Sequence, residues 1–149
     1  MLQPHEAFLI HSGMPDGTMV TSCITSQKIF LHAKKPTTEE ARQLLGDEKL
    51  LNAAVRGTHS PSHEQDSAFP LSSAHRIYNF LFSHLKNCLE RVDHLILASD
   101  PDLFLLPWNA LVVEFPSKPE TLHKEVRWLG KELSFALMPN ARAFVSLRQ

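Results

Sequence analysis

The chain has 149 residues, of which 43% are apolar and 21% are charged, and this is enough for one domain with a hydrophobic core. Fifteen basic residues oppose sixteen acidic ones, so the net charge of -1 gives no overall field that favours nucleic acid or anionic lipid. No apolar run approaches the roughly 18 residues of a membrane span, and the N-terminal residues lack the basic flank and apolar core of a secretion signal. We therefore expect a cytoplasmic protein that binds neither nucleic acid nor a membrane.

The first third of the chain predicts an antiparallel meander. Its β-rich segments are Ala7 to His11, Thr18 to Thr25 and Lys28 to His32, and the turn sequences Pro15-Asp16-Gly17 and Ser26-Gln27 separate them. The segments are short and the turns are sharp, as in strands that pair with their sequence neighbours.

A helix is predicted after the meander. Thr37 and Glu40 form a Thr-x-x-Glu capping box, in which a hydroxyl and a carboxylate satisfy free amides at the helix start. The apolar stripe continues to about Arg56, and Gly57 suits the left-handed conformation that ends many helices. Gly46 is a point where this helix can kink or split.

The middle of the chain predicts a loop, a helix and a buried strand. Residues 58–72 are rich in Ser, His and Pro, which is typical of a mobile loop. Apolar residues then recur every 3.6 residues from Ser73 to Arg91, as they do in a helix. The apolar run Leu95 to Ala98 follows and ends in the turn-forming residues Ser99 to Asp102. A helix that leads into a buried strand is typical of a three-layer α/β sheet.

The last third predicts further short elements of both kinds. Apolar residues at three- and four-residue spacing indicate a half-buried helical turn from Leu103 to Leu111, with Pro107 at the start of a turn. The remaining elements are a strand over Val112 to Phe115, a polar segment with one helical turn over Thr121 to Lys131, a strand over Leu133 to Met138, and a final helix after Pro139-Asn140.

The two cysteines, Cys23 and Cys88, are too few and too isolated for a disulfide framework, which favours a reducing compartment. Cys88 lies on the apolar face of a predicted helix, where loss of water disfavours the thiolate, so we expect it to pack rather than react. Cys23 lies on a predicted strand with His11 and His32 as the imidazoles nearest to it along the meander. An ordinary buried cysteine is the expectation there too, because a thiol buried without a base is inert.

The nine histidines show no metal-binding pattern. His59 and His63 are four residues apart, but Pro61 lies between them and a loop does not hold both on one helix face. No Cys-x-x-Cys or His-Glu-x-x-His accompanies them, and we expect neither a metal nor another cofactor. Asp100 and Asp102 flank Pro101, and the expected role of these carboxylates is to bond the amides of a turn.

One candidate contact site remains, in the turn that follows the buried strand. Open α/β sheets bind ligands at the carboxyl ends of their strands, so Ser99, Asp100 and Asp102 are the candidate residues. No catalytic residue is assigned. Trp108 is expected to anchor the core, because Leu106 and Leu111 share its face.

Two stretches carry a family resemblance. The first consists of Asp100, Leu103, Leu106-Pro107-Trp108 and Leu111 after an apolar strand, and the second runs from Trp128 to Ala141. Together they resemble CHAT domains, caspase-like relatives of cysteine peptidases that are often fused to tetratricopeptide repeats. The family usually has Pro-Asp-Gly before the leucine, whereas Ser99 and Pro101 flank Asp100 here. The resemblance implies an α/β fold in which an N-terminal antiparallel meander and a helix precede a partial caspase-like three-layer α/β sheet.

The resemblance also implies what this chain does not contain. CHAT domains carry a histidine next to glycine after one core strand and a nucleophilic cysteine after the next, both later than the matched motifs. This chain has no His-Gly dipeptide and no cysteine after Cys88. We therefore expect one incomplete CHAT-like domain, with the meander and helix over residues 1–57, the mobile loop over 58–72 and the α/β part over 73–149. Such a chain is the non-catalytic N-terminal part of a peptidase domain, either a fragment or a degenerate copy.

Its expected partner is a protein or peptide, such as a tetratricopeptide-repeat region or the missing half of the domain. The alternative is a self-contained protein–protein interaction module that uses an exposed sheet edge. A small independent hydrolase is a third hypothesis, for which the sequence offers no catalytic set.

Overall fold

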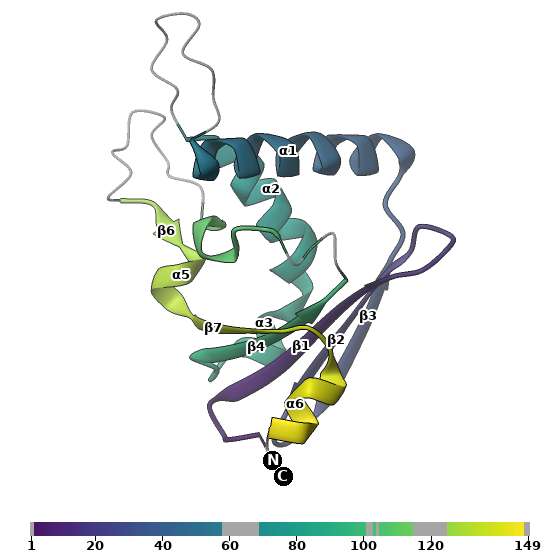
Figure 1. Ribbon diagram of the computed structural model, residues 1–149, viewed down its shortest axis with the longest axis vertical. Coiled ribbons are helices and arrows are strands. Elements are labelled where there is room, and N and C mark those ends of the chain that lie inside the picture. Colours follow the sequence, from purple (N-terminus) through teal and green to yellow (C-terminus); the bar gives the residue numbers. More distant parts are fainter. Residues whose placement is uncertain (1, 58–68, 101–102, 104, 115–124, 148–149) are drawn as a thin grey trace, which may run out of the picture.

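The computed structural model describes residues 2–57, 69–100, 103, 105–114 and 125–147 of the chain. Its architecture is mixed α/β, as the sequence predicts, and Figure 1 shows the helices arranged around one main sheet. The sheet has five strands in the order β3-β2-β1-β4-β7, with bounds β1 Glu6–Gly13, β2 Met19–Thr25, β3 Ile29–Lys34, β4 His94–Ser99 and β7 Ser134–Met138. A second, two-stranded sheet pairs β5 (Val112–Glu114) with β6 (Arg127–Trp128).

Helical elements join these strands. They are α1 (Thr38–Arg56), α2 (Leu71–Phe82), the 3₁₀ turn η1 (Ser83–Leu85), α3 (Lys86–Leu89), the 3₁₀ turn η2 (Trp108–Ala110), α5 (Leu129–Glu132) and α6 (Ala141–Leu147). In Figure 1, α1 crosses the top of the molecule, α2 runs between α1 and the sheet, and α6 lies at the opposite side of the sheet.

The predicted meander is confirmed. β1 pairs antiparallel with β2, and β2 pairs antiparallel with β3, so that Cys23 stands opposite both Leu9 and Phe30. The predicted buried strand is also confirmed, because β4 runs parallel to β1 on one side and to β7 on the other. The chain thus combines an antiparallel half with a parallel half in one sheet.

The first helix begins and ends where the sequence predicts. The Thr37 hydroxyl accepts the Glu40 N–H at 3.1 Å, and the Glu40 carboxylate accepts the Thr37 N–H at 2.8 Å. Gly57 closes the helix in the left-handed conformation with φ of 64°. Helix α1 runs through Gly46 without a break, because the helix on either side of this position continues as one 19-residue element.

The single helix predicted from Ser73 to Arg91 is wrong in its ends and its continuity. Helix α2 already begins at Leu71, inside the predicted loop, and residues 58–68 of that loop lie outside the described residues. After Phe82 the chain tightens into η1, which buries Leu85, and α3 then buries Cys88. The 3₁₀ turn η1 thus separates α2 from α3, and Cys88 of α3 is bonded to Cys23 of β2.

The cysteines form a disulfide, which corrects the prediction of two unpaired cysteines. Cys23 of β2 and Cys88 of α3 are bonded, with their Cα atoms 6.6 Å apart and a sequence separation of 65. Both side chains are buried in the main core. The prediction failed because sequence spacing does not reveal which helix packs on which strand.

Two clusters of apolar side chains cover the two faces of the main sheet. On the helical face Leu9, Leu95 and Leu97 pack with residues of α2, η1 and η2. On the opposite face Phe8, Ile96 and Ala98 form a smaller cluster, and the Phe144 ring of α6 stacks on Phe8 with 4.9 Å between centroids. Successive apolar side chains of β1 and β4 point to opposite faces of the sheet, so each strand contributes to both clusters.

The two stretches that carry the family resemblance lie against each other. Trp108 is buried, as predicted, and so are Leu106 and Leu111. Leu129 donates its N–H to the Leu111 carbonyl at 2.8 Å. A Cβ atom on Gly130 would come within 2.9 Å of the Asn109 Cα, so only glycine allows α5 to pack this closely on η2.

Candidate functional site

A cavity opens at the carboxyl ends of the two central parallel strands. β1 ends at Gly13 and β4 at Ser99, and the cavity beyond them is about 410 Å³ in volume. Helices α1 and α2 supply half of the lining residues, the segment after β4 supplies Asp100, Leu103 and Leu106, and the others come from the turn between β1 and β2 and from Pro36. This is the position at which open α/β sheets bind ligands.

A carboxylate links the ends of the two strands. The Asp100 N–H donates to the His11 carbonyl at 3.2 Å, which continues the parallel pairing by one residue. The Asp100 Oδ2 atom in turn accepts the N–H of Gly13. Asp100 therefore bonds a backbone amide, as the sequence predicts, but the amide belongs to β1 rather than to the turn that follows β4.

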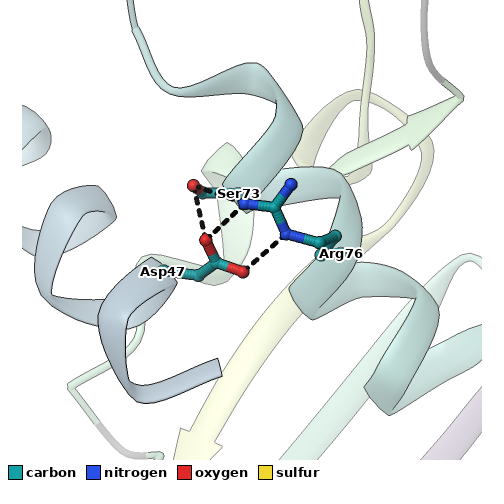
Figure 2. A network of polar contacts seen from close by, with 3 residues as sticks. All are labelled: Asp47, Ser73 and Arg76. Carbon is teal, nitrogen blue, oxygen red and sulfur yellow. Dashed lines mark hydrogen bonds and ion pairs between the residues drawn. The ribbon is translucent and has the colours of Figure 1, made fainter. Parts of the chain in front are cut away.

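A second, more polar hollow of about 300 Å³ adjoins the cavity, and Leu44 and Phe80 line both. Its floor holds the network shown in Figure 2, in which Asp47 of α1 faces Ser73 and Arg76 of α2. The Arg76 guanidinium donates to both carboxylate oxygens of Asp47, from Nε at 2.8 Å and from Nη2 at 2.6 Å. The Ser73 hydroxyl donates to the same carboxylate at 2.7 Å.

This network keeps Asp47 ionised in the interface between α1 and α2. Burial raises the pKa of the Asp47 carboxyl, but the hydrogen bonds from Arg76 and Ser73 and the charge of Arg76 outweigh it, so the pKa lies below its usual range. Asp47 is only 3% exposed, whereas 42% of the Arg76 side chain is exposed. The arrangement joins two helices and presents a guanidinium edge that is already neutralised, and this fits a structural role.

A fully buried histidine lies near the cavity, on the helical face of β1. His11 is 0% exposed, and its Nδ1 atom lies 2.9 Å from the Thr21 Oγ1 atom. Its ring stacks on Trp108 with centroids 5.9 Å apart and an interplanar angle of 10°. Burial, followed by the charge of His84, lowers the pKa of His11 to about 3, so the ring is neutral near pH 7.

Three ring nitrogens in this region have no hydrogen-bond partner among the residues that the structure describes: His11 Nε2, Trp108 Nε1 and His84 Nε2. His84 stacks on His32 with 3.9 Å between centroids, and burial, then the charges of His32 and Lys34, lower its pKa to about 4. A base of this kind activates a thiol only if one is in reach. Cys23 and Cys88 are bonded to each other, so these imidazoles have no free thiol to act on within the described residues.

The predicted site and motif residues lie in different parts of the structure. Asp100 lines the cavity, together with the motif residues Leu103 and Leu106. Pro107 precedes η2 as predicted, and Trp108 and Leu111 belong to the core rather than to the cavity. Asp102 lies outside the described residues, as does the side chain of Ser99.

The two histidines considered as metal ligands, His59 and His63, also lie outside the described residues. Elsewhere in the described part of the chain, no three His, Cys, Asp or Glu side chains come together as they would around a metal ion.

Sequence reasoning missed the Asp47 network and the buried His11. A usable signal existed for both. Asp47 lies three residues after Leu44 and four before Leu51, so it falls inside the apolar stripe of α1. His11 lies two residues after Leu9 on a strand, which places it on the same face as a core leucine.

Comparisons with protein-family models and with curated proteins find no match for this chain. The likeness to CHAT domains therefore rests on the motif residues alone. Over the described ranges, each helix is too short or too polar to cross a membrane.

Proposed function

We propose that this chain is the non-catalytic opening part of a CHAT-like domain and acts as a scaffold whose sheet is extended at β7. The supporting observation is that β7 has one neighbour, β4, among the described strands. An edge strand presents a row of backbone groups that can pair with another strand. The partner that this predicts is a β-strand, either from the rest of such a domain or from another protein.

One side of the β7 backbone has no paired strand among the described residues. Ser134 pairs with His94 and donates its N–H to the carbonyl of Asp93 at 2.9 Å. Because the amides of a parallel strand alternate between its two sides, the Ala136 N–H also faces β4. The N–H groups of Phe135 and Leu137 then face outward, where an added strand would bond them.

The side chains of β7 also suit pairing. The strand reads Ser-Phe-Ala-Leu-Met. It contains no charged residue and no proline, the residues that usually protect an edge strand from pairing with other chains. The other edge strand, β3, ends in Lys34 and follows Lys28, so cations flank it. We therefore place the added strand at β7 rather than at β3.

The disulfide supports the non-catalytic part of the proposal. A cysteine peptidase needs a thiolate, and both thiols of this chain are consumed in the buried bond between Cys23 and Cys88. The cytoplasmic location that the sequence predicts stays a prediction, and a disulfide is typical of a more oxidising compartment.

A displayed library of eight-residue peptides tests the scaffold proposal. Binders selected on the isotope-labelled chain should shift the amide signals of Phe135 and Leu137, and the substitution Leu137→Pro should abolish binding. Proline removes an outward N–H at this position and no bond to β4, so the sheet should survive. Leu31→Pro on β3 is the matched control and should leave binding intact. Binders that tolerate Leu137→Pro, or that shift only β3, would contradict the proposal.

A self-contained interaction module is the second candidate function, and the surface of β3 favours it. Ile29 and Leu31 of this edge strand are 69% and 68% exposed, and both lie on the face that carries Ile24. Adjacent exposed apolar side chains on a strand are typical of a protein-binding surface. If this candidate is right, the substitution Leu31→Lys weakens partner binding while Leu137→Pro does not.

A further inference from the structure

We propose that the cavity at the carboxyl ends of β1 and β4 binds a small apolar molecule that carries one ammonium group. This site is separate from the proposed pairing edge, because β7 contributes no residue to the cavity. The failure of one proposal therefore leaves the other standing.

The size and walls of the cavity fit a small molecule. Its volume of about 410 Å³ lies within the range of roughly 300 to 1,000 Å³ that is common for ligand sites. Apolar residues of three segments line it, among them Leu44 of α1, Ile77 of α2 and Leu106. Leu45 also lines it and is 59% exposed, so an apolar ligand would cover a side chain that now faces water.

The acidic side chains that line the cavity favour a positively charged ligand. Among the described lining residues the ionisable side chains are Asp100 and Glu48, which are both acidic. The N–H of Gly13 holds the Oδ2 atom of Asp100, and this leaves the Oδ1 atom able to accept a further donor. An ammonium group supplies both the donor and the opposite charge, whereas a carboxylate ligand would meet two like charges.

Three probes of similar shape test the ligand class: 3-phenylpropylammonium, 3-phenylpropanol and 3-phenylpropionate. Each is titrated into the isotope-labelled chain, and the amide signals are followed. We expect the ammonium probe to shift the signals of residues around Leu44, Ile77 and Asp100. Its dissociation constant should be about tenfold lower than that of the alcohol, as is typical for a hydrogen bond to a charged group.

Three substitutions separate charge from shape. Asp100→Asn keeps an acceptor for the Gly13 N–H but removes the charge, so it should weaken the ammonium probe about tenfold and leave the alcohol unchanged. Glu39→Gln removes an exposed carboxylate of α1 outside the cavity and should change neither. Ala41→Phe fills the cavity and should abolish binding of both probes. If Asp100→Asn does not fold, Glu48→Gln provides the second charge variant.

Three results would overturn the proposal. One is binding of phenylpropionate as tight as that of the ammonium probe, and another is the absence of shifts at the lining residues with every probe. The third is a shift of the same signals with protein concentration alone, which would place a second copy of the chain in the cavity.

Discussion

A single glycine joins the two motif segments, because Gly130 lets α5 approach the backbone of Asn109. We predict that Gly130→Ala lowers the free energy of unfolding by about 1 to 3 kcal/mol, since the added methyl group forces backbone apart. Gly46→Ala is the matched control. It lies in open space within α1, so it should raise that free energy by roughly 0.5 to 1 kcal/mol.

Urea titrations of the two variants measure both values. Equal and small effects from the two substitutions would contradict the close approach of α5 and η2.

The buried imidazole of His11 makes stability depend on pH. Its pKa is about 3 in the folded chain and about 6.5 in the unfolded chain. Below pH 6.5 the unfolded chain therefore takes up a proton that the folded chain excludes, and stability falls as the pH falls toward 3. Between pH 7.5 and pH 5 the titration of His11 should lower the free energy of unfolding by about 2 kcal/mol. His84, with a pKa of about 4, acts in the same direction.

Urea unfolding at the two pH values, in the parent chain and in the variant His11→Gln, measures this contribution. The variant should lose most of the pH dependence of stability that is due to His11. An unchanged pH dependence in His11→Gln would show that this imidazole is not held neutral by burial.

At the scale of elements, the disulfide ties β2 to α3 across 65 residues of chain. A cross-link of this span restricts the unfolded chain, and we predict that its loss lowers the free energy of unfolding by about 2 to 4 kcal/mol. The measurement is urea unfolding with and without a dithiol reductant.

The double variant Cys23→Ala, Cys88→Ala should be insensitive to the reductant and should resemble the reduced parent chain. Two free thiols in the unfolded, unreduced protein would contradict the bond.

The sequence predicts most elements but not how they contact each other. Thr37, Glu40 and Gly57 mark the ends of α1 because capping is local chemistry. The break at Ser83 was not predictable, because it follows from the contact of His84 with His32 and from the bond at Cys88, both of which depend on tertiary packing. β5 was predicted as a strand, but its pairing with β6 depends on residues far along the chain.

The candidate site shows the same limit. Asp100 was found because strand ends and turn residues are visible in sequence. The cavity walls that α1 contributes, such as Leu44, were not found, because the position of α1 relative to β4 depends on the packing of α1 on α2.

For the whole molecule, the proposed scaffold function depends on the edge of the sheet at β7, which has no second neighbour among the described strands. The leading functional candidate needs an edge that can accept a strand, and β7 contains no charge and no proline. The cavity and the disulfide concern other parts of the fold, so neither replaces a test of that edge.

Hydrogen exchange of single β7 amides, followed by NMR in the isolated chain, tests this claim most directly. We expect strong protection of the Ala136 amide, which faces β4, and exchange at least roughly tenfold faster at Phe135 and Leu137, whose N–H groups face outward. Equal protection of the three amides in a monomeric sample would mean that the outer side of β7 is already paired, and would contradict the account.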